Sequence, residues 1–203
     1  MSHPGRGPLL HARSRGLYPA SAALLFLAVA APLAARASAG AAGGSAAVLR
    51  VLAVTAGVAL VGSGLTGADP DLEAGTPRSR PPLRLAHLGI AALAVTAALT
   101  AGQLLAHPSS GASSWDDLQV VGRDVAGLLG LQVITAALAG ARLCWLPPTF
   151  WVLVILAAGG GEHGWKLVLS MPLSPPGTTA AAVTAVSLLT VGAAVHATIR
   201  VTR

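Results

Sequence analysis

Residues Gly122 to Pro148 read GRDVAGLLGLQVITAALAGARLCWLPP, a long apolar stretch that starts beside a charged pair and ends at two prolines. No charged residue lies between Asp124 and Arg142. A helix needs about 20 mainly apolar residues to cross the hydrocarbon core of a bilayer, which is roughly 30 Å thick. The stretch therefore predicts a membrane helix with its charges near the two ends.

The rest of the chain has the same character. Of 203 residues, 54% are hydrophobic and only 10% are charged, whereas an average soluble domain has about 25% charged residues. Because lipid offers no water to bare backbone groups, long apolar runs must be helices. The predicted fold is an all-α, polytopic membrane helical bundle of about six transmembrane helices. The six apolar runs are residues 17–35, 46–65, 85–106, 118–141, 144–161 and 178–199.

The thirteen basic residues predict the orientation of this bundle. Cytoplasmic segments of membrane proteins carry an excess of lysine and arginine. With the N-terminus in the cytoplasm, the inner segments hold most of these residues. The outer segments then hold only Arg36, Arg50, Arg123 and Lys166. We therefore expect a multi-pass protein of the cell membrane with both termini in the cytoplasm, in which residues 1–16 form a tail and residues 17–203 a single transmembrane domain.

The first apolar run has an alternative interpretation. Three arginines precede it and the triplet Ala37 to Ala39 follows it, as in a signal peptide with a cleavage site. The run is longer than the 7–15 residues that are usual for the apolar part of a signal peptide, which favours a retained span. Cleavage would leave five spans in the same orientation.

Two rows of polar residues interrupt the apolar pattern. The row on the third run consists of Thr96, Thr100, Gln103 and His107, which share one side of a helix. The row on the fourth run consists of Asp116, Gln119 and Arg123, which also share a face. Because ionisable residues in a span are candidate functional residues, the rows are a candidate lining of an outward-facing pathway. In the alternative, the threonines bond to their own helix and the charges neutralise one another near the lipid headgroups.

The fourth run also predicts how its helix packs and where it stops. Gly122, Ala126 and Gly130 form a row of small residues that lets another helix approach closely. A helix from Trp115 to Leu143 would be about 43 Å long at 1.5 Å per residue, which places Arg123 near the outer interface. The pair Pro147-Pro148 is expected to break the chain at a tight inner turn.

Catalytic and metal-binding patterns are scarce in the sequence. Glu162 and His163 adjoin each other in a glycine-rich loop, but no H-E-x-x-H pattern or pair of cysteines accompanies them. No G-x-x-x-x-G-K-[ST] sequence occurs, so ATP hydrolysis would need a separate subunit. The arginines are dispersed, which disfavours nucleic-acid binding despite a net charge of +6. The sequence thus predicts no enzyme, no cofactor and no metal ion.

The string GRDVAGLLGLQVITAALAGARLCWLPPTFWVLVIL, with a later tryptophan, the MPLSPP segment and a final alanine-rich span, resembles small polytopic membrane proteins of GC-rich actinobacteria. Such proteins are often taken to be the membrane half of ABC-2-type exporters. The resemblance covers about Gly122 to Gly177 and implies a permease subunit that pairs with a second permease and recruits a separate ATP-binding subunit. This chain departs from the pattern in its short length and its lack of a recognisable coupling helix.

Two functions follow from these features. In the first, the chain is the permease subunit of an exporter, and residues 66–84 or the turn at Arg142 contact the ATPase. In the second, it is a non-transporting accessory or scaffold protein whose spans pack against a partner in the lipid bilayer. A co-purifying ATPase would distinguish the first function from the second.

Overall fold

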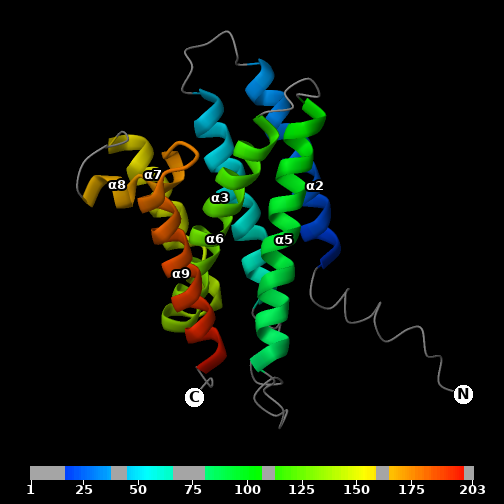
Figure 1. The fold of residues 1–203 in the computed structure, drawn as a ribbon. Coiled ribbons are helices and arrows are strands. Elements are labelled where there is room, and N and C mark those ends of the chain that lie inside the picture. Colours follow the sequence, from blue (N-terminus) through cyan, green and yellow to red (C-terminus); the bar gives the residue numbers. More distant parts are fainter. Residues whose placement is uncertain (1–16, 38–44, 66–80, 107–112, 159–164, 199–203) are drawn as a thin grey trace, which may run out of the picture.

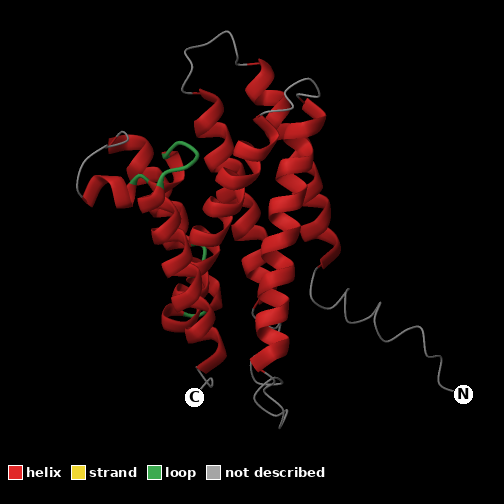
Figure 2. Ribbon diagram, viewed as in Figure 1, coloured by secondary structure: helices red, strands yellow, loops and turns green. Residues whose placement is uncertain are grey.

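The computed structural model of the chain describes residues 17–37, 45–65, 81–106, 113–158 and 165–198, and these ranges contain helices and no strand (Figure 2). Three short helical elements are η1 (Ala141–Leu143), α8 (Trp165–Leu169) and η2 (Met171–Leu173). The all-α prediction is confirmed. The six longer helices are α2 (Leu17–Ala37), α3 (Ser45–Leu65), α5 (Pro81–Ala106), α6 (Ser113–Ala139), α7 (Leu146–Ala158) and α9 (Thr179–Thr198).

The six longer helices form one antiparallel bundle around α6. Successive helices run in opposite directions, so that the start of α2 and the end of α9 lie at the same end of the bundle (Figure 1). Helix α6 packs against α3, α5, α7 and α9, most extensively against α9. Helices α5, α6 and α9 contain the longest apolar stretches. In the most apolar part of each of these three helices, the buried share of the residues is 61% for α6, 33% for α5 and 17% for α9. Helix α6 is therefore the central helix.

The apolar core lies where α3, α5 and α6 meet. On α3, Val51, Val54 and Val58 are spaced by three and four residues and point to the same side of the helix. They pack with Leu128 and Leu129 of α6, which are almost completely buried. The buried residues of both helices thus form one continuous core.

The outward faces of the bundle are also apolar. Phe26 on α2, Leu93 on α5 and Val186 on α9 each expose more than half of their surface. Large exposed apolar surfaces are unusual for soluble proteins and are typical of surfaces that contact lipid. Three helical stretches are long and apolar enough to cross a membrane, namely Leu85–Leu105, Trp115–Ala139 and Thr179–Thr198. These features indicate a membrane protein.

The other three helices contain shorter apolar stretches, Ala22–Ala34, Ala46–Gly62 and Leu146–Ala158. Helix α7 has 13 residues, which gives it a length of about 20 Å. It is shorter than the predicted run 144–161, of which residues 159–161 lie outside the described ranges.

The predicted break after the fourth run is at the wrong residues. The helix expected to reach Leu143 ends at Ala139, because Gly140 has a φ of 84°, and a residue with positive φ cannot continue a right-handed helix. Pro147 and Pro148 lie in the first turn of α7 instead of in the turn before it. Proline fits there because the first backbone N–H groups of a helix have no partner within it.

The only cysteine of the chain, Cys144, has 2% of its surface exposed. We expect its thiol to react with a maleimide on the order of tenfold or more slowly in the folded protein than in dodecyl sulfate, because labelling requires local opening. A gel-shift time course measures both rates. In the control Arg142→Cys/Cys144→Ala the thiol moves to an exposed residue of the same turn and should react at similar rates in both states. Equal rates for Cys144 itself would contradict its burial.

Candidate functional site

A buried pair of opposite charges lies in the central helix α6. Arg123 donates from Nε to Oδ1 of Asp124 over 3.0 Å, and its Nη2 lies 2.9 Å from the same oxygen. The side chain of Asp124 is 0% exposed and that of Arg123 is 8% exposed. Both charges are thus removed from solvent and held against each other.

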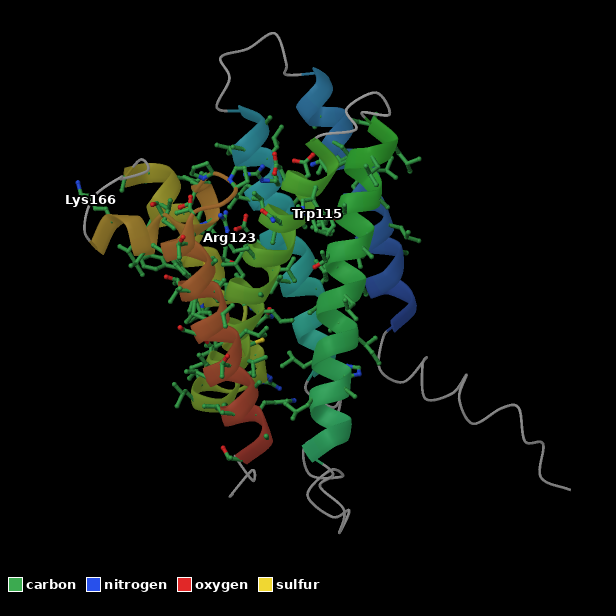
Figure 3. The ribbon with its side chains drawn as sticks, in the orientation of Figure 1. Trp115, Arg123 and Lys166 are labelled. Carbon is green, nitrogen blue, oxygen red and sulfur yellow. The ribbon has the colours of Figure 1, made fainter. Side chains whose placement is uncertain are left out.

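Arg123 also binds the segment that leads into α9. Its Nη1 donates to the backbone carbonyl of Pro175 over 3.1 Å, and its Nη2 donates to that of Ser174 over 2.9 Å. Figure 3 shows the side chain of Arg123 between α6 and this segment. Just before the segment, Met171 is completely buried, and its sulfur lies 2.8 Å from the place where a Cβ on Gly127 would stand. Arg123 and Met171 together fix the start of α9 to α6.

A second arginine, on α3, acts on the pair through its charge. Arg50 is half-buried, and its positive charge attracts the carboxylate of Asp124. Two polar atoms at this place have no hydrogen-bond partner within the described part of the chain, namely Nε of Arg50 and Oδ2 of Asp124. We call Arg50, Arg123 and Asp124 the charge cluster.

The predicted row on α6 does not come together around Arg123. Asp116 and Gln119 are exposed near the start of the helix. The hydrogen bonds of Arg123 within the described residues go instead to Asp124, Ser174 and Pro175. A pathway lined by Asp116, Gln119 and Arg123 remains a prediction.

The predicted row on α5 lies partly toward α6. Thr96 is half-buried, and its methyl group is 3.8 Å from the place where a Cβ on Gly122 would stand. Thr100 is 8% exposed, and its hydroxyl has no partner in the ranges that the structure describes. Gln103 is half-buried, whereas His107 lies outside the described residues. The role of this row as a pathway lining also remains a prediction.

The row of small residues on α6 contacts two different helices. Gly122 faces Thr96 of α5, and Ala126 is half-buried. Gly130 instead faces α9, where a Cβ would stand 2.5 Å from the carbonyl group of Leu188. Gly192 of α9 packs against Gly130, since a Cβ on Gly192 would stand 2.7 Å from the Gly130 carbonyl oxygen. The two glycines mark the point where α6 and α9 cross.

Gln132 is a buried polar residue that the sequence analysis did not single out. It is 1% exposed, and its Nε2 lies 3.5 Å from Sγ of Cys144. Its Oε1 has no partner among the residues described. The amide packs against Gly62 of α3, where a Cβ would overlap with Nε2 of Gln132. A polar side chain in the middle of an apolar run was the signal that could have identified it.

Gly62→Ala is expected to lower the free energy of unfolding by about 1–3 kcal/mol, because the new methyl group displaces the buried amide of Gln132. In Gly62→Ala/Gln132→Ala the amide is absent and the loss should be smaller than the sum of the two single losses. Thermal unfolding of the four proteins, followed by size-exclusion chromatography, measures this coupling. Additive losses would contradict the contact.

The charge cluster was only partly predictable. Asp124 falls on the buried face of α6, three residues after Val121 and four before Leu128, and this spacing was a signal for its burial. Arg50 was expected among the outer basic residues, and its contact with α6 depends on how α3 packs. Chemically, the cluster offers two guanidinium groups and one carboxylate in an apolar setting. The described residues contain no group of His, Cys, Asp or Glu that could hold a metal ion.

In comparisons with known protein families, curated proteins and solved structures, the chain matches none of them.

Proposed function

We propose that the chain is a multi-pass protein of the cell membrane with six spans and cytoplasmic termini, and that it is the permease subunit of an ABC-type export system with a separate ATPase. The observation that carries the proposal is the charge cluster inside a largely apolar bundle. Charged side chains in a membrane-spanning helix are costly and commonly mark the pathway of a substrate or ion. The resemblance of Gly122 to Gly177 to exporter subunits supports the same function.

The position of the helix ends supports the proposed orientation. The start of α2 and the end of α9 lie at one end of the bundle, together with the end of α6 (Figure 1). The turn after α6 exposes Arg142 and Trp145, and the indole of Trp145 donates to the carbonyl of Arg142 over 3.1 Å. Arginine and tryptophan are typical of membrane interfaces, and arginine is enriched on the cytoplasmic side.

This orientation predicts the behaviour of reporter fusions. Green fluorescent protein fused after Arg203 should fluoresce, because it matures in the cytoplasm, and alkaline phosphatase at the same position should be inactive. Alkaline phosphatase inserted after Lys166, which projects away from the bundle on α8 (Figure 3), should be active. The opposite pattern would reverse the proposed topology.

The ATPase is expected at the same end of the bundle as the termini. The two candidate contacts are the turn at Arg142 and residues 66–84, of which residues 66–80 lie outside the described ranges. Affinity purification in mild detergent, followed by mass spectrometry, should identify an ATP-binding subunit, and the purified complex should hydrolyse ATP. Arg142→Glu should weaken this association, whereas the matched charge reversal Lys166→Glu at the other end should not. Purification without an ATPase would contradict the proposal.

A non-transporting accessory or scaffold protein is the second candidate. It is favoured by the number of polar groups whose bonds stay within the chain. Arg123 bonds to backbone carbonyls of Ser174 and Pro175. The hydroxyls of several threonines donate to backbone carbonyls of their own helices. These residues are Thr55, Thr135, Thr184, Thr190 and Thr198. Recovery of the chain with another membrane protein but no ATPase would support this function.

A further inference from the structure

We propose that the charge cluster binds a singly charged oxyanion, a phosphate or carboxylate group, between α3 and α6. This inference rests on the proposed function, because it names the charged group of the solute or lipid that the cluster would meet. Its two supports are the balance of charge and the balance of hydrogen bonds among Arg50, Arg123 and Asp124.

The cluster has one positive charge too many. Arg123 and Asp124 form an ion pair, so their charges compensate each other. Among the residues that the structure describes, Arg50 then has no ion-pair partner of its own, and this holds whichever arginine is paired with Asp124. A charge that is partly removed from water and has no partner is unfavourable, because it loses part of its hydration without a compensating attraction. A single negative charge from a ligand would restore the balance.

Other acidic groups on α6 do not supply this charge. Asp117 shares a helical face with Asp124, but it is seven residues away, which is about 10 Å along the helix. Asp117 is half-buried and Asp116 is exposed, and neither forms an ion pair with Arg50 in the described ranges. Since no acidic residue of the described ranges pairs with Arg50, a negative charge from outside the cluster would complete the balance.

The unused hydrogen-bonding groups specify the chemistry of the ligand. Nε of Arg50 is buried and has no acceptor within the described ranges, and a guanidinium group forms paired bonds with phosphate or carboxylate oxygens. Oδ2 of Asp124 is buried and lacks a donor there. The fitting ligand thus combines an anionic oxygen with an O–H or N–H group. Inorganic phosphate has both groups, and so does the headgroup of phosphatidylglycerol.

The test uses the full chain, purified in a neutral detergent and in phosphatidylcholine nanodiscs. In the first arm, inorganic phosphate is titrated and its binding is followed by calorimetry, with chloride as the control anion. In the second arm, phosphatidylglycerol is added to the nanodiscs and the retained lipid is identified by native mass spectrometry. Phosphate binding alone would assign the site to a free solute, and lipid retention alone would assign it to a headgroup. Binding in either arm supports an oxyanion site.

Matched variants locate the binding. Arg50→Gln should weaken it about tenfold or more, because it removes the charge and the forked donors. Lys166→Gln removes one positive charge from exposed α8, outside the cluster, and should leave affinity unchanged. Arg50→Lys keeps the charge and should have an intermediate affinity, which tests the site even where Arg50→Gln fails to fold. Absence of binding in both arms, or equal losses in Arg50→Gln and Lys166→Gln, would overturn the proposal.

These measurements do not depend on transport or on an ATPase. An oxyanion site in a chain that purifies without an ATPase would support this inference and reject the exporter. An ATPase complex whose permease binds neither phosphate nor phosphatidylglycerol would support the exporter and reject this inference.

Discussion

Arg123→Gln is expected to lower the free energy of unfolding by about 3–5 kcal/mol, because the buried carboxylate of Asp124 loses its ion pair and keeps only the attraction of Arg50, with which it forms no ion pair among the described contacts. The variant also loses the donors that bind the carbonyls of Ser174 and Pro175. Of the contacts of Arg123 and Met171 that hold the start of α9 to α6, only the packing of Met171 against Gly127 would remain. We therefore expect the loss to appear both in stability and in the ordering of this segment.

Unfolding of this variant can be followed with a thiol-reactive dye, because the chain has one cysteine and Cys144 is buried. Arg142→Gln is the matched control, since Arg142 is exposed and its removal should change stability by less than about 0.5 kcal/mol. Arg123→Leu/Asp124→Leu should recover most of the loss, because apolar residues of similar volume often replace a buried ion pair without cost. A variant Arg123→Gln as stable as the control would show that the pair contributes nothing.

Gly130→Ala is expected to destabilise the crossing of α6 and α9 by about 1–3 kcal/mol. The new Cβ would stand 2.5 Å from backbone atoms of Leu188 and Leu189. Backbone atoms cannot rotate away as a side chain can, so α9 must move away from the helix that it contacts most extensively. Gly192→Ala should have a similar effect, because its Cβ would meet the carbonyl of Gly130.

Gly89 on α5 provides the control for this substitution. It is exposed, and a Cβ there would have no atom within 4 Å. Gly89→Ala should therefore leave stability unchanged or raise it by up to about 1 kcal/mol through its better helix propensity. Thermal unfolding by dye labelling of Cys144 compares the three proteins. Equal stability of Gly130→Ala and Gly89→Ala would contradict the close crossing of α6 and α9.

The helices could be predicted from the sequence because their signal is local. Six runs of apolar residues predict six helices, and a helix lies in each run, although within the described residues only three of these helices are long and apolar enough to cross a membrane. The end of α6 was harder to predict, because the chain offers both Gly140 and the pair Pro147-Pro148 as helix breakers. A glycine with positive φ stops the helix at once, whereas a proline is tolerated in a first turn.

The charge cluster could not be predicted as a unit because its contacts are not local. Arg50 and Asp124 are on different helices, and Ser174 precedes a third. Their proximity depends on which helices become neighbours and on how each helix is rotated, and neither is set by residue spacing within one run. Conversely, residues that share a helical face by spacing need not act together. Asp116 and Gln119 share a face of α6 with Arg123, but the side chain of Arg123 binds Ser174 and Pro175.

The central position of α6 has a consequence for the order in which the protein is made. Translation produces α2, α3 and α5 before α6, so Arg50 leaves the ribosome well before Asp124 is added to the chain. Ser174 and Pro175, which accept hydrogen bonds from Arg123, are synthesised later still. The nascent chain therefore carries Arg50 without the carboxylate that its charge attracts until the fourth long helix emerges. A chain truncated after α7 would contain the ion pair but not the carbonyl groups that complete the coordination of Arg123.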